Sequence, residues 1–130
     1  MIVVDASCLG EILVNGSRAD VARDRLSRDT EHAAPHAIDV EVFGIIRRLR
    51  MEEAIDETTA SLAVDDLGLW PGERFGHRAL LERAWELRAT VRGWDAMYVV
   101  LAEVLEAPLI TLDARLARAS GPRCLVELIS

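Results

Sequence analysis

The chain contains no lysine, although it is 130 residues long and carries fifteen basic side chains, all of which are arginines. Phosphate-binding P-loops and Schiff-base enzymes require a lysine, as do the usual forms of receiver domains and of phosphatases with an aspartate nucleophile. The glycines do not form a dinucleotide-binding motif either, because no Gly-x-Gly-x-x-Gly pattern follows the first predicted strand. These classes, including dinucleotide-binding domains, are therefore excluded.

Long apolar runs and clustered cysteines are also missing. No uninterrupted apolar run approaches the roughly 18 to 20 residues that a membrane-spanning helix needs, so we expect no membrane association. The N-terminal Met-Ile-Val-Val-Asp segment lacks a basic region and is too short for a signal peptide, which predicts a cytoplasmic protein. Cys8 and Cys124 lack metal-ligand spacing and are expected to behave as small buried hydrophobic residues.

The net charge of −7 argues against a general basic surface for nucleic acid, because attraction to phosphates requires positive charge. Hydrophobic periodicity predicts strands alternating with helices, which is typical of an α/β fold with a mostly parallel central sheet flanked by helices. We expect a single domain over residues 1–130. The predicted strands cover residues 2–5, 32–34, 67–70, 109–112 and 124–128; the predicted helices cover 6–14, 18–29, 36–51, 56–67, 78–91, 94–106 and 113–119.

Four acidic residues stand where apolar segments begin or end, namely Asp5, Glu41, Asp95 and Asp113. Asp5 and Asp113 follow predicted strands, and sites in parallel sheets form beyond the carboxyl ends of the strands. Glu41 falls on the apolar stripe of its helix, and Asp95 opens a very apolar helix. Each acid alone has a structural alternative, as a helix cap, as a partner of the helix dipole or, for Glu41, in an arginine salt bridge. One shared pocket accounts for all four.

Such a pocket requires a cation. Two carboxylates about 4 Å apart repel by roughly 4 kcal/mol at an effective dielectric constant of 20. Ligation by oxygen alone favours Mg²⁺, or Mn²⁺, over zinc. Because Mg²⁺ keeps several waters and shares its coordination sphere with phosphates, the acids predict phosphodiester hydrolysis by a metal-activated water.

Four sequence blocks carry a family resemblance. They are Val3-Val4-Asp5-Ala6-Ser7, Glu41-Val42, Trp94-Asp95-Ala96-Met97-Tyr98-Val99 with Leu101-Ala102-Glu103, and Leu109-Ile110-Thr111-Leu112-Asp113-Ala114-Arg115-Leu116-Ala117. Together they resemble the PIN-domain nucleases, specifically the VapC toxins of toxin-antitoxin pairs, from end to end of the chain. The chain departs from the residues common in that family at Gly44, Arg92 and Trp94.

The resemblance implies a magnesium-dependent endoribonuclease that cuts structured cellular RNA, forms a homodimer and is silenced by a cognate antitoxin. It also implies that Asp5, Glu41, Asp95 and Asp113 are the catalytic, metal-binding acids, with Ser7 as a supporting hydroxyl or a simple first-turn helix residue. One alternative is a degenerate PIN domain that binds RNA or a partner protein without cleavage. Another is a magnesium-dependent phosphatase or DNA flap nuclease that uses the same site.

Other side chains are candidates for contacts with RNA or protein. Arg92 and Arg115 stand near the third and fourth acids, and Arg47 and Arg48 follow Glu41, so both pairs are candidates for RNA phosphate contacts; the alternative is a solvated helix face. Tryptophans are expected mainly in the core rather than stacked on bases. The antitoxin is expected on an apolar patch formed by Leu62, Leu67, Leu69 and Trp70.

Overall fold

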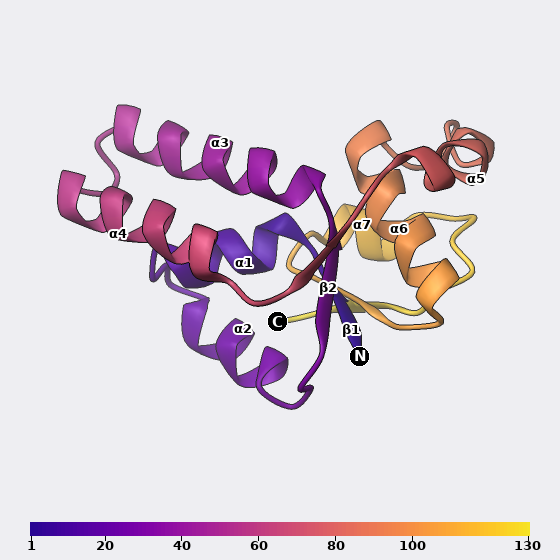
Figure 1. The fold of residues 1–130 in the computed structure, drawn as a ribbon, viewed down its shortest axis with the longest axis horizontal. Helices are drawn as coiled ribbons and strands as arrows, with labels where there is room; N and C mark the ends of the chain where they lie inside the picture. Colours follow the sequence, from indigo (N-terminus) through magenta and orange to yellow (C-terminus); the bar gives the residue numbers. More distant parts are fainter.

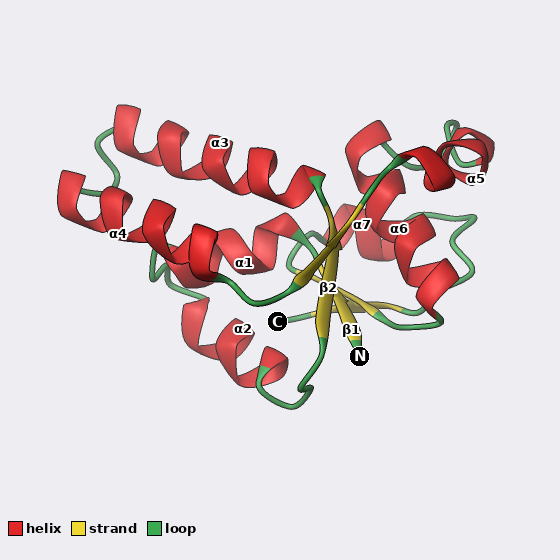
Figure 2. Ribbon diagram, in the orientation of Figure 1, coloured by secondary structure: helices red, strands yellow, loops and turns green.

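A five-stranded parallel sheet forms the centre of the fold (Figure 2) in the computed structural model, which describes residues 1–130. Its strand order is β3-β2-β1-β4-β5. The central strands consist almost entirely of apolar residues because helices cover both of their faces. The strands are β1 (Ile2–Val4), β2 (His32–Pro35), β3 (Glu73–Phe75), β4 (Leu109–Thr111) and β5 (Val126–Leu128).

Helices form a layer on either side of the sheet. Figure 1 shows the helices of the first half of the chain on the left of the sheet and α5 and α6 on its right. A 3₁₀ turn at Arg78–Leu80 precedes α5. The helices are α1 (Ala6–Leu13), α2 (Ala19–Leu26), α3 (Ala37–Met51), α4 (Glu57–Leu69), α5 (Leu81–Glu86), α6 (Gly93–Leu105) and α7 (Ala114–Arg118). The predicted α/β class with a parallel sheet is confirmed. None of the helices combines the length and apolar character required to span a membrane.

Close packing of α1 against α3 fixes the helix layer beside β1. A Cβ atom added at Gly10 of α1 would lie 3.2 Å from the Cδ1 atom of Ile45, so only glycine permits this separation without a shift. Ile45 lies one helical turn after Glu41 on α3. This contact therefore holds the helix that carries Glu41 next to the helix that follows Asp5.

Two predicted elements are placed differently by the structure. Residues 67–70 were predicted as a strand, but α4 continues to Leu69 because Ala60, Ala63 and Leu67 form its buried stripe at helical spacing. Pro71 then requires an extended residue before it, and Trp70 has φ −58° and ψ 122°. The strand is β3, three residues further on, which pairs in parallel with β2. Its residues are partly exposed, so it lacks the apolar signal of a buried strand.

The predicted helix over residues 78–91 is also shorter in the structure. Regular α-helix ends at Glu86, and Arg88 donates from Nη1 to the carbonyl oxygen of Trp85 at 2.9 Å. The hydroxyl of Thr90 donates to the carbonyl of Ser120 at 2.6 Å. Side-chain bonds to backbone oxygens compete with the helical pattern and favour the turns that lead to α6.

The order of the strands determines where a site can form. The chain moves outward from β1 to β2 and β3 and then returns to the other side of β1 as β4 and β5. The crevice beyond the carboxyl ends of strands at such a reversal is the usual ligand site of an open parallel sheet. Helices that connect parallel strands run back against them, so α1, α3, α6 and α7 all begin at this carboxyl edge.

Candidate active site

All four predicted acids lie at the carboxyl edge of the sheet. Asp5 follows β1, Asp113 follows β4, Asp95 lies in the first turn of α6 and Glu41 lies in the second turn of α3. Their charges act on one another: Asp5 and Asp95 raise the pKa of Glu41, and Asp5 and Asp113 raise that of Asp95. The fold therefore brings four carboxylates that are remote in sequence within electrostatic reach.

Asp5 is the most buried of the acids, with 5% of its surface exposed. Its Oδ2 atom accepts hydrogen bonds from Ser7 Oγ and Thr111 Oγ1, both at 2.7 Å. Burial raises the pKa of Asp5, these hydroxyl bonds oppose that rise, and the charge of Asp113 adds to it. The Asp5 side chain forms no cap hydrogen bond, so the capping alternative does not account for it.

The two hydroxyl groups are themselves held by the backbone that follows β4. The amide of Leu112 donates to Ser7 Oγ at 3.1 Å, and the amide of Asp113 donates to Thr111 Oγ1 at 3.0 Å. Each hydroxyl is thus oriented to donate its own hydrogen to Asp5 Oδ2, while no side chain donates to Oδ1. Sequence reasoning singled out Ser7 but missed Thr111, whose available signal was a single polar residue in an otherwise apolar strand.

Glu41 has no arginine partner, contrary to the salt-bridge alternative. Its Oε1 accepts a hydrogen bond of 2.8 Å from the hydroxyl of Tyr98, a fully buried residue of α6. Burial is the main reason why the pKa of Glu41 rises to about 7; the Tyr98 hydrogen bond lowers it, and the charges of Asp5 and Asp95 raise it further. Burial and the charge of Glu41 also raise the pKa of Tyr98, which keeps the hydroxyl protonated as a donor.

Asp95 faces a small charged cavity of about 130 Å³ at the edge of the site. Asp113 lines the same cavity, together with Arg92, Arg115 and Thr90. The pKa of Asp95 rises to about 6, first because of burial and then because of Asp5 and Asp113, while the two arginines lower it. This cavity places positive side chains directly beside two of the acids.

Asp113 has a local structural role in addition to its place in the site. Its Oδ1 accepts a hydrogen bond from the backbone amide of Arg115 at 2.8 Å, so Asp113 is the N-cap of α7. The helix-cap alternative predicted from the sequence is therefore correct for this acid. The Nε of Arg115 lies 3.6 Å from the same oxygen. Capping uses one carboxylate oxygen and leaves the other without a side-chain donor.

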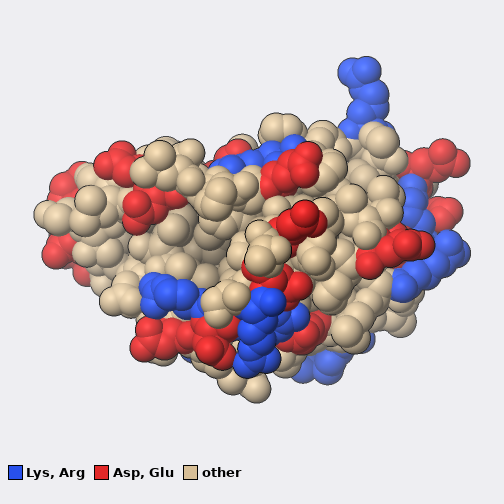
Figure 3. All heavy atoms as spheres, turned by 60° about the horizontal axis from the view of Figure 1, so that its bottom comes forward, with Lys and Arg blue, Asp and Glu red and all other residues tan.

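The other two arginine candidates lie away from this cavity. Arg47 lines a groove between α3 and α4, and Arg48 is an exposed residue further along α3. On the face shown in Figure 3, basic and acidic side chains are interspersed and no broad basic surface forms. Positive charge near the acids is therefore supplied locally, by Arg92 and Arg115.

The composition of the site determines which metal ion it suits. No group of three or more His, Cys, Asp or Glu side chains is arranged closely enough in this structure to hold a metal ion. The available donors are carboxylate oxygens, since Cys124 lines a separate cavity and the buried Cys8 donates from Sγ to the carbonyl oxygen of Ile110 at 3.5 Å. Open carboxylate donors fit Mg²⁺ or Mn²⁺, which retain waters, and do not fit the closed nitrogen and sulfur shell of structural zinc.

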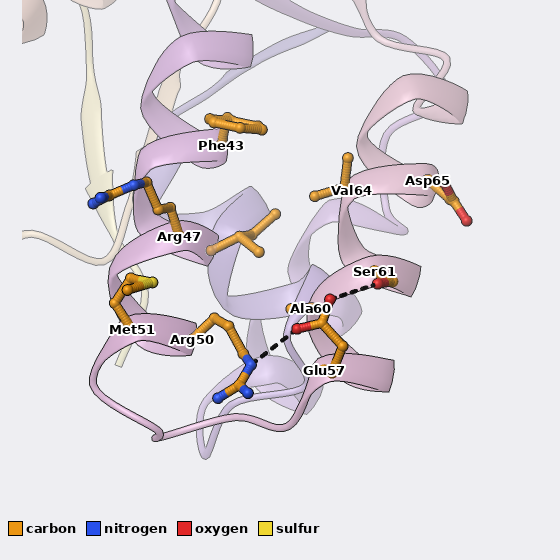
Figure 4. Close-up of a pocket in the computed structure, with 10 residues that line it drawn as sticks. Phe43, Arg47, Arg50, Met51, Glu57, Ala60, Ser61, Val64 and Asp65 are labelled. Atoms are coloured by element: carbon orange, nitrogen blue, oxygen red, sulfur yellow. Dashed lines mark hydrogen bonds and ion pairs between the residues drawn. The ribbon is translucent and has the colours of Figure 1, made fainter.

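An apolar groove runs between α3 and α4 (Figure 4). Two adjoining cavities of about 330 and 530 Å³ share Phe43 of α3 and Val64 of α4. Phe43 is 53% exposed, and Arg50 forms an ion pair with Glu57 at 3.0 Å at the end of the groove next to the loop that joins the two helices. The predicted apolar patch is only partly correct, because Leu67 belongs to the core whereas Leu62 and Leu69 are exposed.

Two of the three tryptophans contradict the prediction that they lie in the core. Trp85 and Trp94 are exposed, whereas Trp70 packs against the core. Trp85 lies on α5, a helix of six residues that buries only Ala84. The guanidinium of Arg88 lies over its ring at 4.6 Å, which shields part of the indole from water.

Comparison with known proteins gives extensive matches. A family model described as PIN domain matches residues 2–122. Ribonuclease VapC1 of Mycobacterium tuberculosis is 36% identical over 128 residues, or 98% of this chain and 96% of the relative. Ribonuclease VapC12 of the same organism is 36% identical over 130 residues, the full length of both chains. Ribonuclease VapC3 is 40% identical over 119 residues, or 91% of this chain and 86% of the relative. The resemblance drawn from the four sequence blocks is confirmed.

Proposed function

Since the chain belongs to the VapC ribonucleases of the PIN-domain family, we propose that it is a magnesium-dependent endoribonuclease and the toxin of a toxin-antitoxin pair. Its proposed substrate is structured cellular RNA, and its proposed reaction is hydrolysis of a phosphodiester bond. The observation that carries this proposal is the gathering of four carboxylates without a compensating arginine on Glu41 or a cap role for Asp5.

Asp5, Glu41, Asp95 and Asp113 are the proposed metal-holding residues. When bound, Mg²⁺ or Mn²⁺ supplies a water of lowered pKa and stabilises charge on the phosphate oxygens. Ser7 and Thr111 both donate to Oδ2 of Asp5 and thereby leave Oδ1 without a side-chain donor. Because the pKa values of Glu41 and Asp95 are raised to about 7 and about 6, a bound cation would favour the ionised form of both carboxylates and lower these values.

Arg92 and Arg115 are the proposed contacts for RNA phosphates. Both line the cavity that Asp95 and Asp113 share, so a phosphate there would lie next to the acids. Their positive charge favours entry of an anionic backbone into a chain with a net charge of −7. Arg47 and Arg48 remain candidates for more distant contacts along the RNA, since they lie on α3 beyond Glu41.

Cleavage of structured RNA by the purified protein tests the enzyme assignment. We expect cleavage with Mg²⁺, loss of cleavage with EDTA, and a loss of at least about a hundredfold for Asp5→Asn, because a positioned metal ligand is removed. Asp66→Asn on the exposed side of α4 is the matched control and should cleave like the wild type. Cleavage that persists in EDTA would refute the metal mechanism.

The same assay separates the alternatives. RNA binding without cleavage at any metal concentration would identify a degenerate PIN domain. Faster cleavage of single-stranded or flap DNA than of RNA would favour a DNA nuclease, and release of phosphate from monoesters would favour a phosphatase. The acids alone serve all of these reactions, so the substrate panel is necessary.

The antitoxin is the proposed occupant of the α3–α4 groove. An amphipathic segment could bury apolar side chains against Phe43 and Val64, with Arg47 and Asp65 available at the rim. Phe43→Asp should weaken binding of the small protein encoded beside the gene at least about tenfold and leave RNA cleavage intact. Val104→Asp, at an apolar residue of α6 that is also exposed, is the matched control. Unchanged binding by Phe43→Asp would exclude the groove.

The proposed function also includes a cellular location and an oligomeric state for the protein. We propose that the protein acts in the cytoplasm, where cellular RNA is available, and that it forms a homodimer. Light scattering of the purified protein at several concentrations tests the dimer. A mass corresponding to one chain at all concentrations would exclude it.

A further inference from the structure

We propose that Tyr98 is the positioning residue for Glu41: its hydroxyl holds the glutamate carboxylate in the orientation in which its second oxygen, Oε2, can bind the metal. The inference rests on the proposed function, because it assumes that the four acids hold the ion. Tyr98 is not a catalytic residue in this proposal, since it acts only through Glu41.

The path of the polypeptide explains why Tyr98 can do this. Tyr98 lies three residues after Asp95 on α6, so both side chains project from the same side of the helix. Its ring is fully buried in the core, and its hydroxyl donates to Glu41 Oε1 at 2.8 Å. Figure 1 shows α3 and α6 on opposite sides of the sheet, so this hydrogen bond joins the two helix layers at the carboxyl edge.

Glu41 needs such a partner because other interactions favour a different position. Three rotatable bonds separate its carboxylate from the backbone, and neighbouring charges on Asp5 and Asp95 repel it. Tyr98 is the side chain that donates a hydrogen bond to it, and no arginine forms an ion pair with it. Without the hydroxyl, electrostatic repulsion and side-chain entropy both favour rotation of the carboxylate toward solvent.

The hydrogen bond also leaves the metal-binding capacity of the carboxylate available. A carboxylate has two oxygens with about four lone-pair sites, of which the hydroxyl uses one on Oε1. A donor that orients a metal ligand through its other oxygen typically changes metal affinity or activity by 10- to 100-fold when it is removed. A tyrosine that merely fills the core would have no such effect on metal binding.

Tyr98→Phe is the informative variant because it removes one oxygen atom and keeps the buried ring. We expect the Mg²⁺ concentration for half-maximal RNA cleavage to rise about tenfold or more, with the cleavage rate largely recovered at saturating Mg²⁺. Titration calorimetry with Mn²⁺ alone should show a similar loss of affinity. The variant should keep a single cooperative urea transition in EDTA and the circular dichroism spectrum of the wild type, which separates positioning from misfolding. Ser27→Ala, at the C-cap of helix α2, is the control for loss of a hydroxyl.

A double-substitution cycle identifies Glu41 as the residue through which Tyr98 acts. In the Glu41→Gln background, Tyr98→Phe should change Mn²⁺ affinity by less than about twofold, because the ligand that it positions is absent. An unchanged Mg²⁺ requirement in Tyr98→Phe, or an equal effect in both backgrounds, would overturn the proposal while leaving the nuclease assignment intact. A wild-type protein that neither binds Mn²⁺ nor requires Mg²⁺ would instead refute the proposed function and this inference with it.

Discussion

Replacing Glu41 with glutamine is expected to stabilise the metal-free protein at pH 8. The pKa of Glu41 rises from 4.5 to about 7 in the folded protein, first through burial and then through the charges of Asp5 and Asp95, against the opposing Tyr98 hydrogen bond. Unfolding returns the carboxylate to water and to its ordinary pKa. Between these two pKa values the folded state therefore binds more protons than the unfolded state.

The sign of the pH dependence follows from that difference in bound protons. Where the folded state holds more protons, the free energy of unfolding falls as the pH rises. Glu41 should therefore cause stability to decline between about pH 4.5 and pH 7 and to level off above that. Asp95 acts in the same direction between 3.8 and about 6, through burial, Asp5 and Asp113.

The raised pKa of Glu41 also sets an upper limit on the change in the free energy of unfolding that Glu41→Gln causes at pH 8. At about 1.4 kcal/mol per pH unit, the raised pKa of Glu41 corresponds to an upper limit of roughly 3 to 4 kcal/mol. Glu41 is only half-buried, and solvent screening reduces the effect to about 1 to 2 kcal/mol. Glu41→Gln keeps the shape and can still accept the Tyr98 hydrogen bond, so the variant should recover roughly this amount at pH 8 in EDTA. At pH 4.5 the two proteins should differ by less than about 0.5 kcal/mol, since Glu41 is then protonated in the folded state.

Urea unfolding followed by circular dichroism at both pH values, in EDTA and in excess Mg²⁺, measures these differences. Mg²⁺ should stabilise the wild type more than the variant, because binding to the folded state alone adds stability. Glu73→Gln is the control, since Glu73 is exposed on β3 and forms no ion pair. A glutamine variant that is less stable than the wild type at pH 8 in EDTA, or equally shifted at both pH values, would refute the burial argument.

Four further substitutions test other parts of the structure. Arg92→Ala and Arg115→Ala should each raise the KM for RNA several-fold. Each should also reduce the slope of log affinity against log salt concentration by about the contribution of one phosphate contact, and an unchanged slope would argue against phosphate binding. Thr111→Val should lower the free energy of unfolding by about 1 to 3 kcal/mol in urea titrations, because it removes a buried donor to Asp5 and an acceptor for Asp113, and a neutral effect would contradict this account. Arg83→Met should lower the free energy of unfolding by about 2 to 3 kcal/mol, because the Glu103 side chain is 12% exposed and would lose its ion-pair partner at 2.9 Å. Adding Glu103→Leu should restore much of that loss, because it removes the unpaired carboxylate.

The local hydrophobic pattern of the sequence was sufficient to predict most of the strands and helices. The segments around β1 and β4 are so apolar that each predicts a buried strand, and Asp5 and Asp113 directly follow them. The failures have a common origin, because β3 and α5 lie at the periphery of the fold. Glu73–Phe75 is a partly exposed edge strand and α5 buries little of its surface, so neither carries a strong hydrophobic period.

The sequence by itself determined which residues can carry chemistry here: four acids at element ends, the absence of lysine and the four family blocks. Only the tertiary structure decided their partners, because the decisive contacts join residues that are far apart in the chain. Thr111 reaches Asp5 across 106 positions, and Tyr98 reaches Glu41 across 57. The tertiary structure likewise placed Arg92 and Arg115 in one cavity with Asp95 and Asp113, and Arg47 in another groove. Periodicity indicates which side of a helix is buried, but the order of the strands determines what that side meets.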